Sequence, residues 1–92
     1  MHVEVRFAGL FRRYVGEQKK VFDVPDGSAA GDLLLLIGRE YGSRLPNNLW
    51  DEESGRFHRS IRIARSGSPT LDETEALRDG DEILLIFALA GG

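Results

Sequence analysis

Two adjacent glycines, Gly91 and Gly92, close the sequence and are the residues whose type and spacing most suggest chemistry. They follow the apolar run of residues 83–87, which is typical of a β-strand, with only residues 88–90 between. Glycine has no Cβ and reaches backbone conformations closed to other residues, so a diglycine tail can thread a narrow cleft. We therefore expect the carboxylate of Gly92 to be the reactive group, presented as an electrophile. The alternative is a frayed chain end, because termini are often poorly ordered.

The side chains offer little material for an ordinary active site. His2 and His58 lie in different segments, the chain has no cysteine, and no Ser-His-acid pattern occurs. Both histidines are therefore interpreted as strand or loop residues. The acidic residues 51–53 have no second ligand cluster, so we expect them to be solvated and predict no metal site. No phosphate-binding G-x-x-x-x-G-K-[ST] motif is present, so we expect no cofactor and infer that a partner supplies any nucleotide.

Composition limits the chain to one small domain. It has 92 residues, of which 41% are hydrophobic and 29% charged, and its net charge is −3. We expect a single domain over residues 1–92 with a flexible tail at 88–92. The acidic balance argues against nucleic acid as the main partner. No apolar stretch approaches the ~18 residues of a membrane span, and no signal-like segment occurs, so we expect a cytoplasmic protein.

The first half of the chain predicts two strands followed by a helix. Residues 3, 5 and 7 are apolar and alternate with polar residues, which indicates a half-buried strand. A short helical turn between Gly9 and Gly16 is possible, and residues 20–24 form a second strand that pairs with the first. Residues 29–41 have helical periodicity, with Ser28 or Ala29 as the N-cap and Gly42 ending the helix. The predicted buried face is Ala30, Leu33, Leu34, Ile37 and Tyr41, with Leu35 or Leu36 partly exposed.

The second half predicts two further strands. Residues 43–57 are interpreted as a long connection that holds Trp50, and Ile61 and Ile63 mark a third strand. A short segment near 70–71, a turn at 75–77 and a turn at 79–81 lead to the last strand, residues 82–87. Both faces of that strand are apolar, which favours the middle of a sheet and often parallel pairing. This order of elements predicts a mixed sheet that grips one helix.

The pattern resembles the MoaD/ThiS family of ubiquitin-like β-grasp sulfur carriers. The N-terminal stretch VRFAGLFRRYVGEQKKVFDVPDGSAAGDLLLLI and the ending DGDEILLIFALAGG carry the resemblance, which covers nearly the whole chain. Phe87 and Ala88 stand where the molybdopterin-type ending usually has two prolines, and ILLIFALAGG is more similar to the thiamine-type ending. The connection DEESGRFHRSIRI is similar to that of longer members, including those tied to cysteine synthesis.

The resemblance implies an α+β, ubiquitin-like β-grasp fold in which a mixed sheet of four to five strands packs on one main helix. It also implies that the chain is no enzyme by itself but a protein cosubstrate or the small subunit of a heteromeric synthase. An E1-like adenylating enzyme of the MoeB/ThiF type would activate Gly92, with Gly91 allowing close approach. The resulting thiocarboxylate would donate sulfur to a biosynthetic enzyme for molybdopterin, thiamine, cysteine or another sulfur-containing metabolite.

A docking surface is expected around the last strand. Phe87, Leu89 and Ala90 are the candidate partner-binding residues, together with whichever of Leu84 and Ile86 face outward. The alternative is that loop 43–57, with Trp50, covers these side chains within the monomer. Arg6, Arg62 and Arg65 are interpreted either as a basic rim or as ordinary solvated charges.

Two other functions remain open at this stage. A protein modifier would use the same adenylated Gly92 but pass it to a lysine of another protein as an isopeptide. Lys19 and Lys20 are the only lysines, which disfavours chains of the protein on itself. An inert binding module would be unaffected by removal of Gly91 and Gly92.

Overall fold

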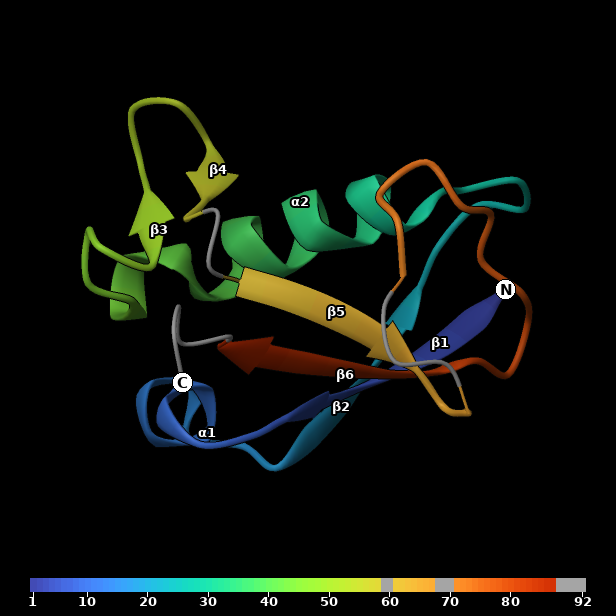
Figure 1. The fold of residues 1–92 in the computed structure, drawn as a ribbon, viewed down its shortest axis with the longest axis horizontal. Coiled ribbons are helices and arrows are strands. Elements are labelled where there is room, and N and C mark those ends of the chain that lie inside the picture. Colours follow the sequence, from blue (N-terminus) through green and yellow to red (C-terminus); the bar gives the residue numbers. More distant parts are fainter. Residues whose placement is uncertain (59–60, 68–70, 88–92) are drawn as a thin grey trace.

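The apolar run near the end of the sequence forms the central strand of a four-stranded sheet (Figure 1). The computed structural model describes residues 1–58, 61–67 and 71–87. The strands are β1 (His2–Phe7), β2 (Lys19–Asp23), β5 (Ile61–Arg65) and β6 (Glu82–Phe87), in the order β2-β1-β6-β5. Strand β6 runs parallel to β1 and antiparallel to β5, whereas β1 and β2 form an antiparallel hairpin. The mixed sheet, its central last strand and the pairing of β1 with β2 are those that the sequence predicts.

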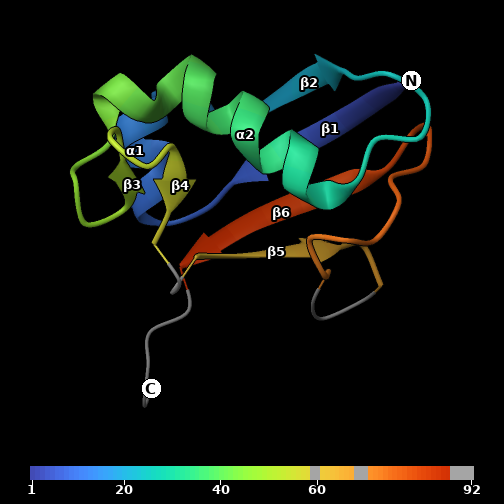
Figure 2. The ribbon, with the colours of Figure 1, turned by 90° about the horizontal axis from the view of Figure 1, so that it is seen from above.

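Helix α2 (Ala30–Tyr41) packs across one face of this sheet (Figure 2). Its first turn is held by the Asp32 carboxylate, which accepts a hydrogen bond of 2.9 Å from the Ala29 N–H. Ala29 is therefore the N-cap, while the Ser28 hydroxyl donates back to the Pro25 carbonyl at 2.7 Å. The backbone N–H groups of the next two residues, Ala30 and Gly31, donate to the carbonyls of residues 75 and 73, so the predicted turn near 75–77 secures the helix start.

The buried face of α2 differs in part from the prediction. Its buried residues are Ala30, Leu33, Ile37, Gly38 and Tyr41. The prediction that Leu34 belongs to this buried set is wrong, because Leu34 is only partly buried at the margin of the core. Leu35 is 42% exposed, as expected. The core lies between this helix face and the inward residues of the sheet, which are Val3, Val5, Phe7, Phe22, Ile61, Ile63, Ile83 and Leu85.

A short helix, α1 (Leu10–Val15), connects β1 and β2. It buries Phe11 and Val15 against the core and ends at Gly16, whose φ of 80° favours glycine. This confirms the predicted helical turn, and β2 starts one residue earlier than predicted. None of the helices in the described part of the chain has both the length and the apolar character needed to cross a bilayer.

The connection from 43 to 57 is more ordered than the sequence predicts. It contains a 3-10 turn, η1 (Gly42–Arg44), and a small antiparallel hairpin of β3 (Trp50–Asp51) and β4 (Arg56–Phe57). The hairpin lies against the C-terminal half of α2 (Figure 1). The Trp50 indole rests on two glycines, because a Cβ on Gly38 would lie 2.1 Å from its ring and one on Gly42 would lie 2.5 Å from its Nε1.

Gly42 follows the last residue of α2, as predicted, but it is not a glycine cap that ends the helix. Its φ of −54° and ψ of −38° are right-handed, so no left-handed cap requires glycine there. Contact with Trp50 requires it instead.

Candidate functional site at the end of strand β6

The candidate site begins where β6 ends. Phe87, the last residue of β6, pairs in register with Ile61, the first residue of β5. Leu89, Ala90, Gly91 and Gly92 lie outside the described residues, as does the side chain of Phe87. The structure therefore positions the strand that carries the diglycine, between β1 and β5, and leaves the site residues themselves as predictions.

The two faces of β6 have different environments. Ile83 and Leu85 are 1% and 0% exposed and face α2. Leu84 and Ile86 lie on the opposite, outer face, where Leu84 is 37% exposed and Ile86 is half-buried. Trp50 sits on α2, on the inner side of the sheet, so the alternative in which it covers the outward residues of β6 is wrong. Leu84 instead lines two shallow hollows of the outer face, both of which include Arg6.

The three arginines proposed as a basic rim play different parts. Arg6 is exposed and its Nε lies 3.2 Å from a Glu4 carboxylate oxygen. Arg62 is exposed and donates to the carbonyl of Ile61 at 3.4 Å. The Arg65 side chain is only 17% exposed and ties β5 to the turn before β6 through Asp81 at 3.0 Å and the Ala76 carbonyl at 2.8 Å. Arg65 therefore stabilises the fold, and of these three arginines only Arg6 and Arg62 have exposed side chains.

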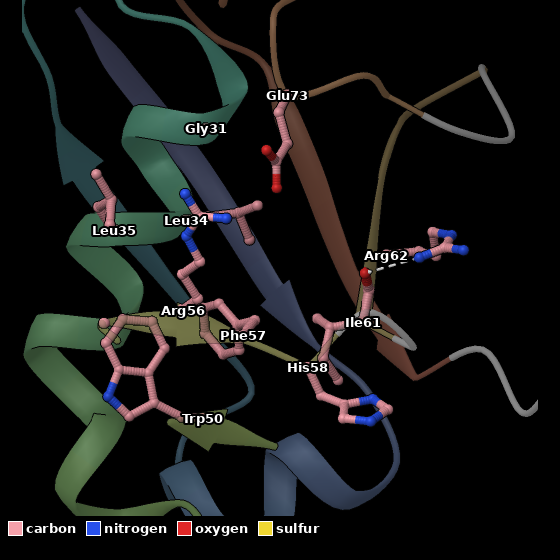
Figure 3. Close-up of a pocket in the computed structure, with 11 residues that line it drawn as sticks. Gly31, Leu34, Leu35, Trp50, Arg56, Phe57, His58, Ile61, Arg62 and Glu73 are labelled. Carbon is pink, nitrogen blue, oxygen red and sulfur yellow. Dashed lines mark hydrogen bonds between the residues drawn. The ribbon is translucent and has the colours of Figure 1, made fainter. Parts of the chain in front are cut away.

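A groove that the sequence did not predict lies between α2, the β3–β4 hairpin and β5 (Figure 3). Its volume is about 570 Å³. Its apolar walls are formed by Leu34, Leu35, Trp50, Phe57 and Ile61, and its polar side chains are Arg56, His58, Arg62 and Glu73. Because Ile61 pairs with Phe87, one end of the groove adjoins the end of β6. The sequence signal for this groove was the pair of aromatic residues Trp50 and Phe57 on either side of Gly55. Gly55 has a φ of 67° at the hairpin turn.

The acidic residues 51–53 do not gather at a site. The Asp51 carboxylate accepts hydrogen bonds from the Glu53 N–H and the Ser54 hydroxyl, both at 3.0 Å, and so shapes the hairpin turn. In the described part of the chain, no group of three or more His, Asp or Glu side chains has the geometry of a metal site. The Nδ1 atom of His2, at the start of β1, lies 3.8 Å from a carboxylate oxygen of Asp23 on β2.

The perturbed ionisable groups gather around Tyr41, which packs against Phe7 of β1 with ring centroids 5.4 Å apart. Burial and a hydrogen bond to the Glu17 carboxylate raise the pKa of Tyr41 to about 12. Lys20 and Glu40 form an exposed pair at 2.6 Å that raises the pKa of Lys20 and lowers that of Glu40. These groups link β2, α2 and the α1–β2 loop, and they form no acid-base pair at the end of β6.

Comparison with known proteins identifies the fold and its relatives. The chain is 27% identical to small archaeal modifier protein 3 of Haloferax volcanii, and the match spans 100% of both chains. Its structure matches that of SAMP1 from Haloferax volcanii with a TM-score of 0.80 at 22% identity, again over 100% of both chains. The chain has a ubiquitin-like β-grasp fold and is similar to the small archaeal modifier proteins. No family model matches the sequence.

A further solved structure shares this fold. The putative molybdopterin converting factor subunit 1 from Pyrococcus furiosus matches with a TM-score of 0.74 and 22% identity, over 96% of this chain and 98% of that one. The proteins that the chain is similar to thus include two named as small archaeal modifier proteins and one named as a putative molybdopterin converting factor subunit.

One relative was solved together with a partner. The BexX/CysO complex of Amycolatopsis orientalis contains a chain that matches with a TM-score of 0.55 and 21% identity, over 98% of this chain and 99% of that one.

Proposed function

We propose that the chain is a sulfur carrier protein whose Gly92 carboxylate is converted to a thiocarboxylate. The observation that carries the proposal is the Gly91-Gly92 pair that follows β6, the central strand of this β-grasp fold, after only three residues. The five residues from 88 to 92 can reach at most ~17 Å beyond the sheet. The folded body can therefore dock on one surface of a partner while Gly92 enters a reaction site some distance away.

The chemistry requires activation, because a carboxylate repels nucleophiles and has no good leaving group. A carboxylate oxygen of Gly92 attacks the α-phosphorus of ATP, pyrophosphate leaves, and an acyl adenylate forms. A persulfide sulfur then attacks the acyl carbon and AMP leaves. A second thiol cleaves the sulfur–sulfur bond and releases the thiocarboxylate. The chain has no cysteine that could carry a persulfide itself, so the sulfur resides on Gly92.

Two classes of partner follow from this sequence of steps. An E1-like adenylating enzyme of the MoeB/ThiF type binds ATP, and a sulfur-accepting biosynthetic enzyme receives the sulfur. Phe87, Leu89 and Ala90 contact these partners, aided by the exposed Leu84 on the outer face. Because adenylation consumes ATP, we place this carrier in the cytoplasm.

A second function, protein modification, is favoured by one specific observation. The full-length relative at 27% identity is named a small archaeal modifier protein. Modification shares the adenylation step, after which a lysine amine of a target attacks the acyl carbon and an isopeptide forms. The two functions thus differ only in which nucleophile reaches the activated Gly92.

The test is intact-mass spectrometry after incubation with a candidate adenylating enzyme, ATP and a sulfur donor. We expect one oxygen to be replaced by sulfur, with the change localised to Gly92. A variant lacking Gly92 should keep its melting temperature and gain no sulfur. A covalent adduct to a target lysine would establish the modifier function instead, and an unchanged mass with every candidate enzyme would contradict both.

A further inference from the structure

Strand β2 forms one margin of the sheet, and its outer edge is unpaired (Figure 2). Met1 and Val24 exchange hydrogen bonds at 2.9 and 2.8 Å, and the Phe7 N–H donates to the Gln18 carbonyl at 2.9 Å. The N–H and C=O groups of successive residues in a strand point to opposite sides of that strand. The backbone groups of the even-numbered residues of β2 therefore form the hydrogen bonds to β1. The N–H and C=O groups of the odd-numbered residues, Lys19, Val21 and Asp23, therefore point away from the sheet.

The opposite margin of the sheet differs. There the Ile63 carbonyl of β5 accepts a hydrogen bond of 2.9 Å from the Leu71 N–H, so part of that edge is already occupied. Within the described residues, no backbone group pairs with the outward edge of β2. An open row of donors and acceptors of this kind is a template for another strand.

The side chains along the β2 edge are open as well. Val21 is 55% exposed, more than any other large apolar side chain in the described part of the protein. The Lys19 and Asp23 side chains are 60% and 80% exposed. Their ion pairs are long, at 3.7 Å from Lys19 to Glu4 and 3.8 Å from Asp23 to both His2 and the Met1 ammonium, so they hold neither side chain firmly.

Two copies of β2 are complementary when they pair antiparallel with Val21 of each chain at the two-fold axis. Val21 then faces its own copy, and each Lys19 faces an Asp23 of the other chain, on the same face of the joined sheet. The three outward residues of one chain meet those of the other as hydrogen-bonded pairs. A register shifted by two residues one way sets Glu17 against Asp23, and the other way sets Lys19 against Pro25, which has no N–H.

We propose that two copies of the chain associate through β2 to form a two-fold symmetric dimer with one continuous sheet. The occupant of the edge is a second copy because charge complementarity and register both select it. Such a contact is isologous and closes on itself, so it yields a dimer and no fibre. The dimer contact lies across β1 from β6, and therefore leaves the end of β6 accessible. The proposal is independent of which nucleophile attacks Gly92.

The test is sedimentation equilibrium combined with amide NMR on the full chain. Concentrations from about 10 µM to about 1 mM cover the range in which so small an interface should dissociate. We expect the weight-average mass to rise toward that of a dimer. The amides of Lys19, Val21 and Asp23 should shift and become protected as concentration rises, while those of β5 should not.

A charge swap distinguishes this contact from any other. Lys19→Glu sets carboxylates against each other at both symmetry-related positions, and Asp23→Lys does the same with ammonium groups. Each should weaken association about tenfold, whereas the Lys19→Glu/Asp23→Lys double variant should restore it. Val21→Pro removes an N–H that points away from β1, so the monomer should stay folded but the dimer should be lost. Val21→Thr keeps the N–H and serves as the matched control.

Two results would overturn the proposal. One is a monomer at every concentration tested. The other is a dimer that Val21→Pro and the single charge variants leave unchanged, which would assign association to a different surface. Circular dichroism melting of each variant verifies that the monomer is folded before association is measured.

Discussion

At the scale of single residues, the contact of Trp50 with Gly38 of α2 and Gly42 of η1 fixes the β3–β4 hairpin. Alanine normally stabilises a helix by about 1 kcal/mol relative to glycine. At Gly38 the added methyl group would lie 2.1 Å from the Trp50 ring, so the indole would have to move. Overpacking of this kind costs about 1–3 kcal/mol, and we expect it to outweigh the helical gain. Gly38→Ala should therefore lower the free energy of unfolding, measured by urea denaturation.

Gly31 provides the matched control for that variant. It lies in the same helix, and a Cβ there would meet the Glu73 carbonyl oxygen at 3.3 Å, a contact that needs a shift of only a few tenths of an ångström. Gly31→Ala should change stability by much less. Stabilisation by Gly38→Ala would show that Trp50 does not rest on α2 in solution.

Tyr41 makes stability depend on pH in the alkaline range. Burial and the Glu17 carboxylate raise its pKa to about 12 in the folded protein, whereas an unfolded tyrosine titrates near 10. The folded state thus holds the phenol proton more tightly. The resulting stability is fully present below about pH 10 and is lost as pH rises from about 10 to about 12.

The Tyr41→Phe variant should lose less stability than the parent across that interval, measured by urea denaturation at several pH values. Tyr14→Phe removes an exposed tyrosine and should behave like the parent. Equal losses in all three proteins would show that Tyr41 does not carry the effect.

At the scale of secondary-structure elements, helix periodicity predicted the existence and ends of α2 but only part of its buried face. Leu33, Leu34 and Leu35 are neighbours in the sequence, and the face that the helix packs on the sheet decides which of them is buried. Leu33 is fully buried, Leu34 partly, and Leu35 is 42% exposed. Leu33→Ala should cost about 2–5 kcal/mol, Leu34→Ala less, and Leu35→Ala under about 0.5 kcal/mol. Urea denaturation of the three variants measures this order, and a larger loss at Leu34 than at Leu33 would contradict it.

Elements that depend on tertiary contacts could not be predicted. Strands β3 and β4 have two residues each, too few for any alternation to show. They exist because Trp50 lies on α2 and packs edge-on against Phe57, with ring centroids 4.8 Å apart. In contrast, β1 and β6 carry their patterns within six residues, so β1 was predicted with its partner β2, and β6 was predicted in the middle of the sheet. The same reasoning explains why the groove beside Ile61 was missed, since the hairpin forms one of its walls.

At the scale of the whole molecule, the fold separates two layers with different tasks. The helix and hairpin cover the inner face of the sheet, whereas the outer face leaves Leu84 exposed beside Arg6, on the strand that carries the diglycine. The sequence predicted an apolar surface at this strand but left open whether Trp50 covers it. The uncovered outer face is therefore the part of the proposed docking surface that the described residues supply.

The corresponding variants test docking without disturbing the core. Leu84→Asp and Leu89→Asp should each weaken binding to the adenylating enzyme by about tenfold, because an interfacial carboxylate would lose its hydration without gaining a partner. Leu35→Asp places the same charge on an equally exposed leucine of α2, on the other side of the molecule, and should bind like the parent. Calorimetric titration measures affinity, and melting temperatures should stay close to the parent in all three. Undiminished binding by both Leu84→Asp and Leu89→Asp would exclude this surface from docking, whereas weakened binding by Leu35→Asp would move the contact to the helix side of the protein.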